Sequence, residues 1–61
     1  QGLTIAIEVP DVDAEHARLM GCDVDIIQPP TDNPWGDRSV IVADPFGLAL
    51  YFYKEIPRAE G

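Results

Sequence analysis

Apolar and polar residues alternate along the first stretch of the chain. The odd-numbered residues of this stretch are all apolar: Leu3, Ile5, Ile7 and Val9. Because successive side chains of a β-strand point to opposite faces, this alternation predicts a strand over about residues 3–9. We expect its odd-numbered face to pack on a hydrophobic core. The even-numbered face, which is small and mixed, should line a cavity or face water.

A short helix is predicted next, over about residues 12–20. Pro10 ends the strand, because it lacks the amide proton that a strand ladder needs. Asp11 or Asp13 then caps the helix with its side chain. Gly21 matches the C-terminal cap position, where a left-handed residue is common.

Three further strands are predicted after the helix. They span about residues 24–28, 38–43 and 48–53. The proline-rich segment 29–36 predicts a loop. The sequence DPFG at residues 44–47 predicts a tight turn, because proline presets φ and glycine tolerates a positive φ. The last two strands should therefore form a hairpin, and residues 54–61 should form a frayed tail.

The predicted order, strand–helix–strand–strand–strand, indicates an α+β fold with one module over residues 1–61. The helix should cover one sheet face and leave the other without a partner in this chain. A chain of 61 residues is marginally stable alone, and its single cysteine, Cys22, allows no internal disulfide. We expect Cys22 to be a half-buried apolar residue. Since Gln1 is not Met, we expect a segment of a longer protein.

The charge balance excludes several classes of partner. The net charge is −7, with eleven acidic residues against four scattered basic ones. Nucleic acids and anionic membranes are bound through clustered Lys and Arg, so neither partner is expected. No apolar run approaches the length of a membrane span. The use of one cysteine is compatible with a reducing compartment, and we expect a cytoplasmic protein.

Two segments resemble the signature of a known family. The run PWGDR at residues 34–38, followed by VIVADPFG at 40–47, resembles that of the glyoxalase/bleomycin-resistance (vicinal oxygen chelate) superfamily. Residues 9–14 resemble the start of one of its βαβββ modules. The resemblance implies that two modules pair into a cup around a ligand. This chain would be one half, and its partner a second module in the same longer chain or in a homodimer.

The resemblance also implies where metal-binding members hold their ion. One ligand, often His, lies early on the first strand, and a second, usually Glu, lies on the last strand. The matching positions here are Thr4 and Tyr51, whose hydroxyls are poor ligands for a divalent metal. We therefore expect no metal ligand and no cofactor from this half, unless another module supplies a divalent metal. Glu8, on the same strand face as Thr4, leaves a shifted site open.

The candidate ligand-binding residues are Thr4, Trp35, Tyr51 and Tyr53. Trp35 is either a stacking platform for a planar ligand or a loop anchor at the sheet edge. Tyr51 and Tyr53 share one strand face and would line the cup. Tyr53 alternatively fills the interface between two modules.

Other polar residues have structural interpretations beside functional ones. Arg38 either clamps an anionic ligand group or, as we prefer, pairs with Asp37, with Asp44 or with a backbone carbonyl at the turn. Asp44 should cap its turn. His16 should be a solvated helix residue. Glu8 is either a catalytic base or a water-exposed edge residue, and we assign no catalytic residue.

Three hypotheses for function follow. The first is a metal-free module that binds aromatic or cationic small molecules, as in antibiotic sequestration. The alternative is half of a metal-dependent lyase, isomerase or extradiol-type dioxygenase whose ligands lie in another module. The third is a half that only completes a sheet and a dimer interface. The sequence leaves open whether the protein is an enzyme.

Overall fold

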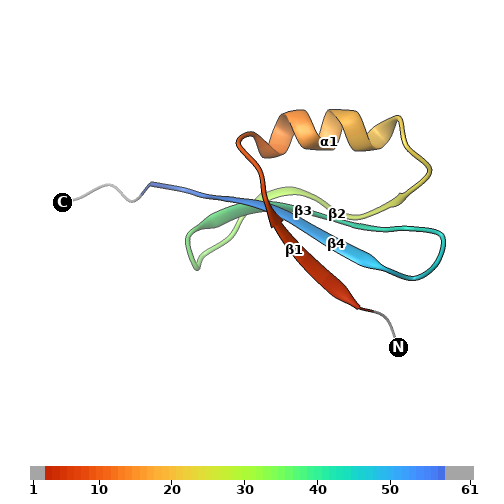
Figure 1. Cartoon of the computed structure of the whole chain (residues 1–61). Coiled ribbons are helices and arrows are strands. Elements are labelled where there is room, and N and C mark those ends of the chain that lie inside the picture. Colours follow the sequence, from red (N-terminus) through yellow and green to blue (C-terminus); the bar gives the residue numbers. More distant parts are fainter. Residues whose placement is uncertain (1–2, 58–61) are drawn as a thin grey trace.

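The computed structural model describes residues 3–57, in which one helix lies on one side of a single sheet (Figure 1). The elements are β1 (Thr4–Glu8), α1 (Val12–Met20), β2 (Asp25–Asp32), β3 (Asp37–Ala43) and β4 (Ala49–Glu55). This order confirms the predicted α+β fold with one βαβββ module. The helix bounds agree with the prediction, and the strand bounds differ from it at their ends.

The four strands lie in the order β1-β4-β3-β2. β1 runs parallel to β4, whereas β2–β3 and β3–β4 are antiparallel pairs. The turn between β3 and β4 is the predicted one. The Asp44 carboxylate accepts hydrogen bonds from the backbone N–H groups of Phe46 and Leu48, both at 2.9 Å, and Gly47 has a φ of 91°. The predicted hairpin and the capping role of Asp44 are therefore confirmed.

The hydrophobic core lies between α1 and the central strands. Val40 and Val42 of β3 are fully buried there, with Phe52 of β4 beside them. Val12 and Leu19 close the core from the helix side. The opposite sheet face is left open within residues 3–57 (Figure 1). Over the same residues, α1 is too short and too polar to cross a membrane.

The apolar face of β1 packs less than expected. Ile5 pairs with Leu50 and Ile7 pairs with Phe52, so this face points to the helix side of the sheet. However, α1 contacts β2, β3 and β4 and does not reach β1. Leu3, Ile5 and Ile7 are therefore exposed, and only Val9 packs against the core. The prediction that the whole face is buried was wrong, because a helix of nine residues covers only part of the sheet.

β2 is longer than the sequence predicted. It continues through Pro29 and Pro30 to Asp32, where a loop was expected. Prolines cannot donate to a strand ladder, but β2 is an edge strand with one neighbour, and its pairing with β3 shifts register on either side of Gln28. The edge position and these irregularities accommodate both prolines.

The ends of α1 match the prediction in part. Asp11 is the N-cap, and its carboxylate accepts a hydrogen bond of 3.1 Å from the N–H of Ala14. Gly21 is the C-cap, but its φ of −91° is not left-handed. Instead, its N–H donates to the carbonyl of Arg18, three residues back, in a tightened last turn. Cys22 is exposed rather than half-buried.

The predicted tail begins later than expected. β4 continues to Glu55, and the N–H of Ile56 donates to the carbonyl of Gly36 at 2.9 Å. Residues 54 and 55 are therefore part of the sheet, because β3 extends far enough to pair with them. Residues 58–61 of the predicted tail, and the expectation attached to Gln1, lie outside the described residues.

Candidate functional site

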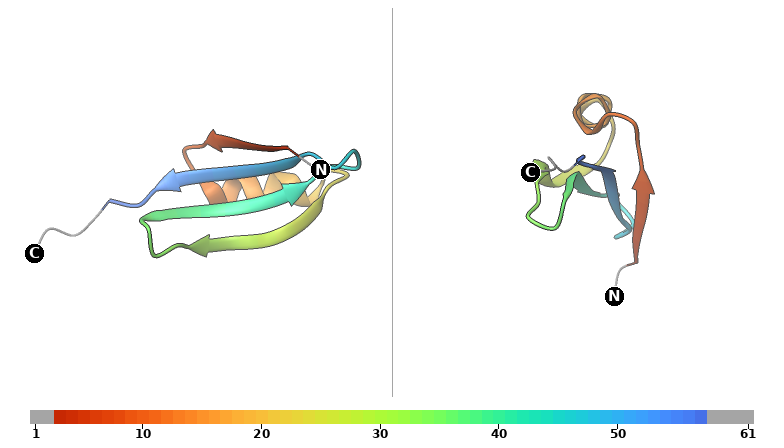
Figure 2. Two further views of the ribbon diagram at one scale, coloured as in Figure 1. Left: turned by 90° about the horizontal axis from the view of Figure 1, so that it is seen from below. Right: turned by 90° about the vertical axis from the view of Figure 1, so that its left-hand side faces the viewer.

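The sheet face opposite α1 is here called the uncovered face. It carries the candidate ligand-binding residues that the sequence predicted on the strands, which are Thr4, Tyr51 and Tyr53. Val40 and Val42 are buried on the helix side, so their neighbours along β3 point to the other side. The strand pairing extends this assignment across β4 and β1. On β1, β3 and β4, the polar and aromatic side chains of the uncovered face are Thr4, Glu8, Asp37, Ser39, Tyr51, Tyr53 and Glu55. Figure 2 (left) looks onto this face, with α1 behind the sheet.

A hollow of about 270 Å³ lies at one end of the uncovered face. Its lining consists of Trp35, Gly36, Asp37, Tyr53, Glu55 and Ile56. The turn between β2 and β3 positions Trp35 at the rim, with Gly36 at a φ of 107°. Backbone hydrogen bonds between Asn33 and Asp37, and from Gly36 to Asn33, close this turn. The indole is 69% exposed and therefore available to a ligand or a partner.

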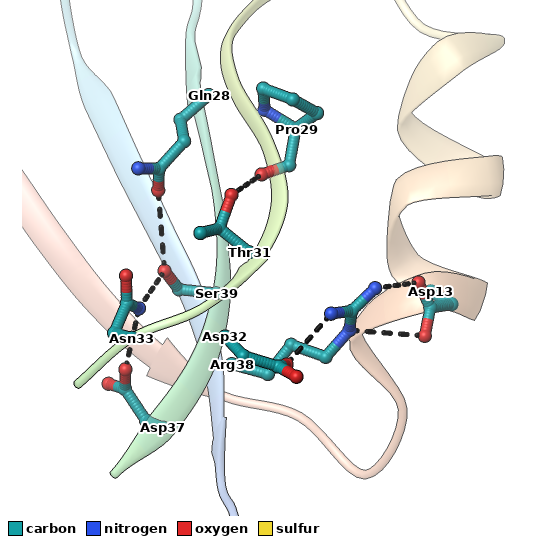
Figure 3. A network of polar contacts seen from close by, with 9 residues as sticks. All are labelled: Asp13, Gln28, Pro29, Thr31, Asp32, Asn33, Asp37, Arg38 and Ser39. Atoms are coloured by element: carbon teal, nitrogen blue, oxygen red, sulfur yellow. Dashed lines mark hydrogen bonds and ion pairs between the residues drawn. The ribbon is translucent and has the colours of Figure 1, made fainter. Parts of the chain in front are cut away.

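A polar network adjoins the hollow (Figure 3). The side-chain amide of Asn33 donates to Asp37 Oδ1 at 2.7 Å and to Ser39 Oγ at 2.9 Å. The Ser39 hydroxyl lies 3.5 Å from Gln28 Oε1, and the Tyr51 hydroxyl donates to Asp37 Oδ2 at 2.9 Å. Asn33, Asp37 and Ser39 are buried. The network therefore fixes the Asp37 carboxylate through both of its oxygens.

The structure brings together three of the four candidate ligand-binding residues. Trp35 and Tyr53 line the hollow, and the rings of Tyr53 and Tyr51 lie 5.8 Å apart at 50°. Thr4 lies apart from them, because it pairs with Ala49 at the far end of β4. Trp35 is too exposed to anchor its loop by burial within the described residues.

Apart from Tyr51, sequence reasoning assigned no site role to the residues of the polar network. Asp37 and Ser39 alternate with Val40 and Val42 along β3, and this period of two was a usable signal for the opposite face. Asn33 gave no such signal. It joins the network through the fold of the turn before β3, which the sequence pattern did not resolve.

Arg38 lies on the helix side of the sheet, away from the uncovered face. Its guanidinium donates to both carboxylate oxygens of Asp13, at 2.8 and 3.3 Å, and to Asp32 at 2.8 Å (Figure 3). These bonds raise the pKa of Arg38 and lower the pKa of Asp13. The predicted partners, Asp37 and Asp44, were wrong. Strand alternation turns residues 37 and 38 to opposite faces, and Asp44 lies beyond the other end of β3, where its carboxylate caps the turn. A clamp for an anionic ligand on the uncovered face is excluded by the same alternation.

The two positions that metal-binding members use do not fit a divalent metal. The Tyr51 hydroxyl donates a hydrogen bond to Asp37. Thr4 is exposed and pairs with Ala49, two residues before Tyr51 on β4. Neutral hydroxyls are poor ligands for such ions. Over residues 3–57, no group of three or more His, Cys, Asp or Glu side chains gathers into a metal site.

Glu8 and His16 lie on opposite sides of the sheet. Glu8 pairs with Tyr53 across β1 and β4, so its side chain belongs to the uncovered face. His16 is partly buried on α1 and not fully solvated as expected. It lies on the far side of the sheet from the hollow, so no acid–base role at this site is available to it.

Comparison with known families and sequences gives consistent matches. Residues 3–52 match the model of the Glyoxalase/Bleomycin resistance protein/Dioxygenase superfamily. An uncharacterized protein of Mycobacterium bovis is 42% identical over 45 residues, which cover 74% of this chain and 30% of that protein. A similar protein of Mycobacterium tuberculosis strain H37Rv has the same identity, with 26% of its length covered. The chain thus spans about a third or less of these relatives.

Solved structures share the fold. A conserved domain protein has a TM-score of 0.79 at 39% identity, with 90% of this chain and 49% of the other covered. TioX from Micromonospora sp. ML1 has a TM-score of 0.81 at 32% identity, with 92% and 46% covered. A glyoxalase/bleomycin resistance protein/dioxygenase from Nocardioides has a TM-score of 0.78 at 23% identity, with 97% and 44% covered, and shows the fold alone. This chain spans about half of each.

Proposed function

This chain belongs to the glyoxalase/bleomycin resistance protein/dioxygenase superfamily, and from that premise we propose that it forms one half of a metal-free cup that binds small aromatic or cationic molecules. The uncovered face supplies the wall of the cup. The superfamily contains both binding proteins and enzymes, so the choice between them rests on the residues of this face. Sequestration of an antibiotic in the cytoplasm is the biological role that we propose for such a cup.

The aromatic hollow is the observation that carries this proposal. Trp35 and Tyr53 line it, and Tyr51 lies beside it on a face that no element within residues 3–57 covers. Sites for drug-sized ligands have volumes of roughly 300–1,000 Å³ and mostly apolar or aromatic walls. The hollow of about 270 Å³ is close to the lower limit, and a facing module would deepen it. Thr4 and Tyr51, at the ligand positions of metal-binding members, support a metal-free site.

A second βαβββ module is the partner that we propose, from the same longer chain or from a second copy. The solved structures that this chain resembles are about twice as long as the matched segment, which supports pairing of two halves. The open sheet face and the exposed apolar row on β1 give the physical reason, because a domain this small buries too little apolar surface alone.

Ligand titration of matched aromatic variants tests the proposal. We expect Trp35→Ala to weaken the binding of planar aromatic cations by about tenfold through the loss of stacking. Phe46→Ala is the control, because Phe46 is 94% exposed on the β3–β4 turn, at the opposite end of β3 from Trp35. Calorimetry or fluorescence measures both affinities. Equal affinities of the two variants would contradict a binding site at the hollow.

Metal analysis of the purified protein tests the proposal that the cup contains no metal ion. We expect no stoichiometric divalent ion after gel filtration in metal-free buffer. A tightly held ion at one per cup would contradict the proposal. It would favour the alternative of a metal-dependent lyase, isomerase or dioxygenase whose ligands lie in the companion module.

A further inference from the structure

We propose that the hollow beside Trp35 is a subsite for a cationic nitrogen, an ammonium or quaternary ammonium group, and that Asp37 is its principal counter-charge. This inference rests on the proposed small-molecule function and specifies which part of the ligand enters this end of the cup. It also assigns a binding role to Asp37 and Glu55, which the sequence pattern did not single out.

The aromatic wall is the first argument. Trp35 and Tyr53 line the same hollow, and neither ring is sequestered in the core. The faces of such rings attract cations within about 6 Å, and tryptophan does so most strongly. An aromatic wall alone would also accept a neutral ring, so the charge of the lining decides between these ligands.

The carboxylates of the lining favour a cation. Asp37 and Glu55 pair across β3 and β4 on the uncovered face, and both line the hollow. Glu8 lies beside Tyr53 on the same face. Anionic ligands would be repelled by these groups, whereas a neutral ligand gains no charge attraction from them.

The nearest basic residues do not neutralise these acids. Arg38 and Lys54 pair with each other one residue further along β3 and β4, so strand alternation turns both to the helix side. Arg38 is held there by Asp13 and Asp32. Within residues 3–57, the lining of the hollow therefore contains carboxylates and no base.

Asp37 is held in position before any ligand arrives. Its side chain is buried, with Asn33 donating to one oxygen and Tyr51 to the other. Each carboxylate oxygen has a second lone pair, so both can accept a further hydrogen bond. Such fixed acceptors favour a donor or a cation at low entropic cost.

Tetramethylammonium is a suitable probe, with tert-butanol as a neutral molecule of similar shape. The indole N–H signal of Trp35 in NMR spectra reports binding at the hollow, and its loss in Trp35→Phe assigns it. The titration is done on the full protein at constant ionic strength, and the shift of this signal gives the affinity of each probe. We expect the affinity for the cation to be at least about threefold higher than that for tert-butanol. Added salt should weaken only the binding of the cation.

Charge-neutralising variants test the role of the carboxylates. Asp37→Asn and Glu55→Gln should each lower the affinity for tetramethylammonium by about threefold or more, with the affinity for tert-butanol unchanged. Asp23→Asn is the matched control, since it removes one negative charge at an exposed position outside the hollow. Glu55 is exposed, so Glu55→Gln carries the test if Asp37→Asn does not fold.

Two results would overturn the inference. One is equal affinity for the cation and tert-butanol, or no response of the Trp35 signal to either. The other is an equal loss of cation affinity in Asp23→Asn and in the two lining variants. In both cases the proposed function survives if Trp35→Ala still weakens the binding of aromatic ligands, so the two failures are distinguishable.

Discussion

At the scale of single residues, Asp37 connects three parts of the molecule. Its carboxylate accepts from Asn33 in the turn before β3 and from Tyr51 on β4, while its own backbone pairs with β4. Removing a buried acceptor leaves its donors without a partner, and this costs more than the hydrogen bond itself contributes. Asp37 therefore contributes to stability as well as to the proposed subsite.

We expect Asp37→Ala to lower the free energy of unfolding by about 1–3 kcal/mol, because two donors lose their acceptor. Urea denaturation measures the change. Asp23→Ala is the control and should change the free energy by less than about 0.5 kcal/mol, as is usual for exposed positions. Similar values for the two variants would show that the network does not stabilise the fold.

The Asp13–Arg38 pair predicts a dependence of stability on pH. The hydrogen bond from Arg38 and its positive charge hold the pKa of Asp13 below its ordinary value of 3.8. The folded state then binds fewer protons than the unfolded state in this range, so stability rises with pH. The contribution of the pair is complete above the unfolded-state pKa and is lost as the pH falls through the folded-state value.

Asp13→Asn should remove this part of the acid sensitivity. We expect the difference in unfolding free energy between wild type and Asp13→Asn to be constant above about pH 5 and to shrink below about pH 4. Denaturant unfolding at a series of pH values measures it. A difference that does not change with pH would contradict the pairing of Asp13 with Arg38.

At the scale of the elements, the turns and caps follow local sequence closely. The β3–β4 turn depends on Asp44 and on the positive φ of Gly47, and α1 begins at Asp11. β2 departs from this rule. Pro29 and Pro30 predicted a loop, but the strand continues through them at the sheet edge. The neighbours of a strand are set by the whole sheet, and local sequence does not contain them.

Two glycines give a matched comparison at this scale. Gly47 has a φ of 91°, so Gly47→Ala should cost about 1–2 kcal/mol through backbone strain, although no atom within 4 Å would contact the new methyl group. Gly21 has a φ of −91°, and an added methyl would meet only the Arg18 carbonyl at 3.6 Å. We expect Gly21→Ala to be neutral or slightly stabilising. Thermal unfolding measures both, and equal effects would contradict the observed turn geometry.

At the scale of the whole molecule, two apolar or aromatic surfaces lack a partner within residues 3–57. One is the uncovered face, and the other is the exposed pair Ile5 and Ile7 on β1, with Leu3 just before the strand. β1 is also a sheet edge, with β4 as its one neighbour. A single module of this size therefore leaves both a sheet face and a strand edge to be completed.

Residues 1–61 produced alone should consequently show stability that depends on concentration. We expect the thermal midpoint to rise with protein concentration, because association stabilises the folded form by mass action. Sedimentation velocity over a dilution series measures the association directly. A monomer that unfolds cooperatively with the same midpoint at every concentration would contradict the need for a second module.

The sequence by itself determined the order of the elements, the βαβββ module, the hairpin turn and the faces of β4. These features depend on residues close together in the chain, whose periodicity and turn preferences express local physics. The same alternation placed Tyr51 and Tyr53 together on one face, and the structure agrees. The family signature likewise lies in contiguous residues, and the match over residues 3–52 confirms it.

Only the tertiary structure decided the rest. It turned Arg38 to Asp13 and Asp32, left Ile5 and Ile7 beyond the reach of α1, and placed Trp35 beside Tyr53 around a hollow. It also joined Asn33, Asp37 and Tyr51 into one network. Each of these contacts depends on strand register, helix length or turn shape. Those quantities are fixed by packing between distant segments, which is why no local pattern contained them.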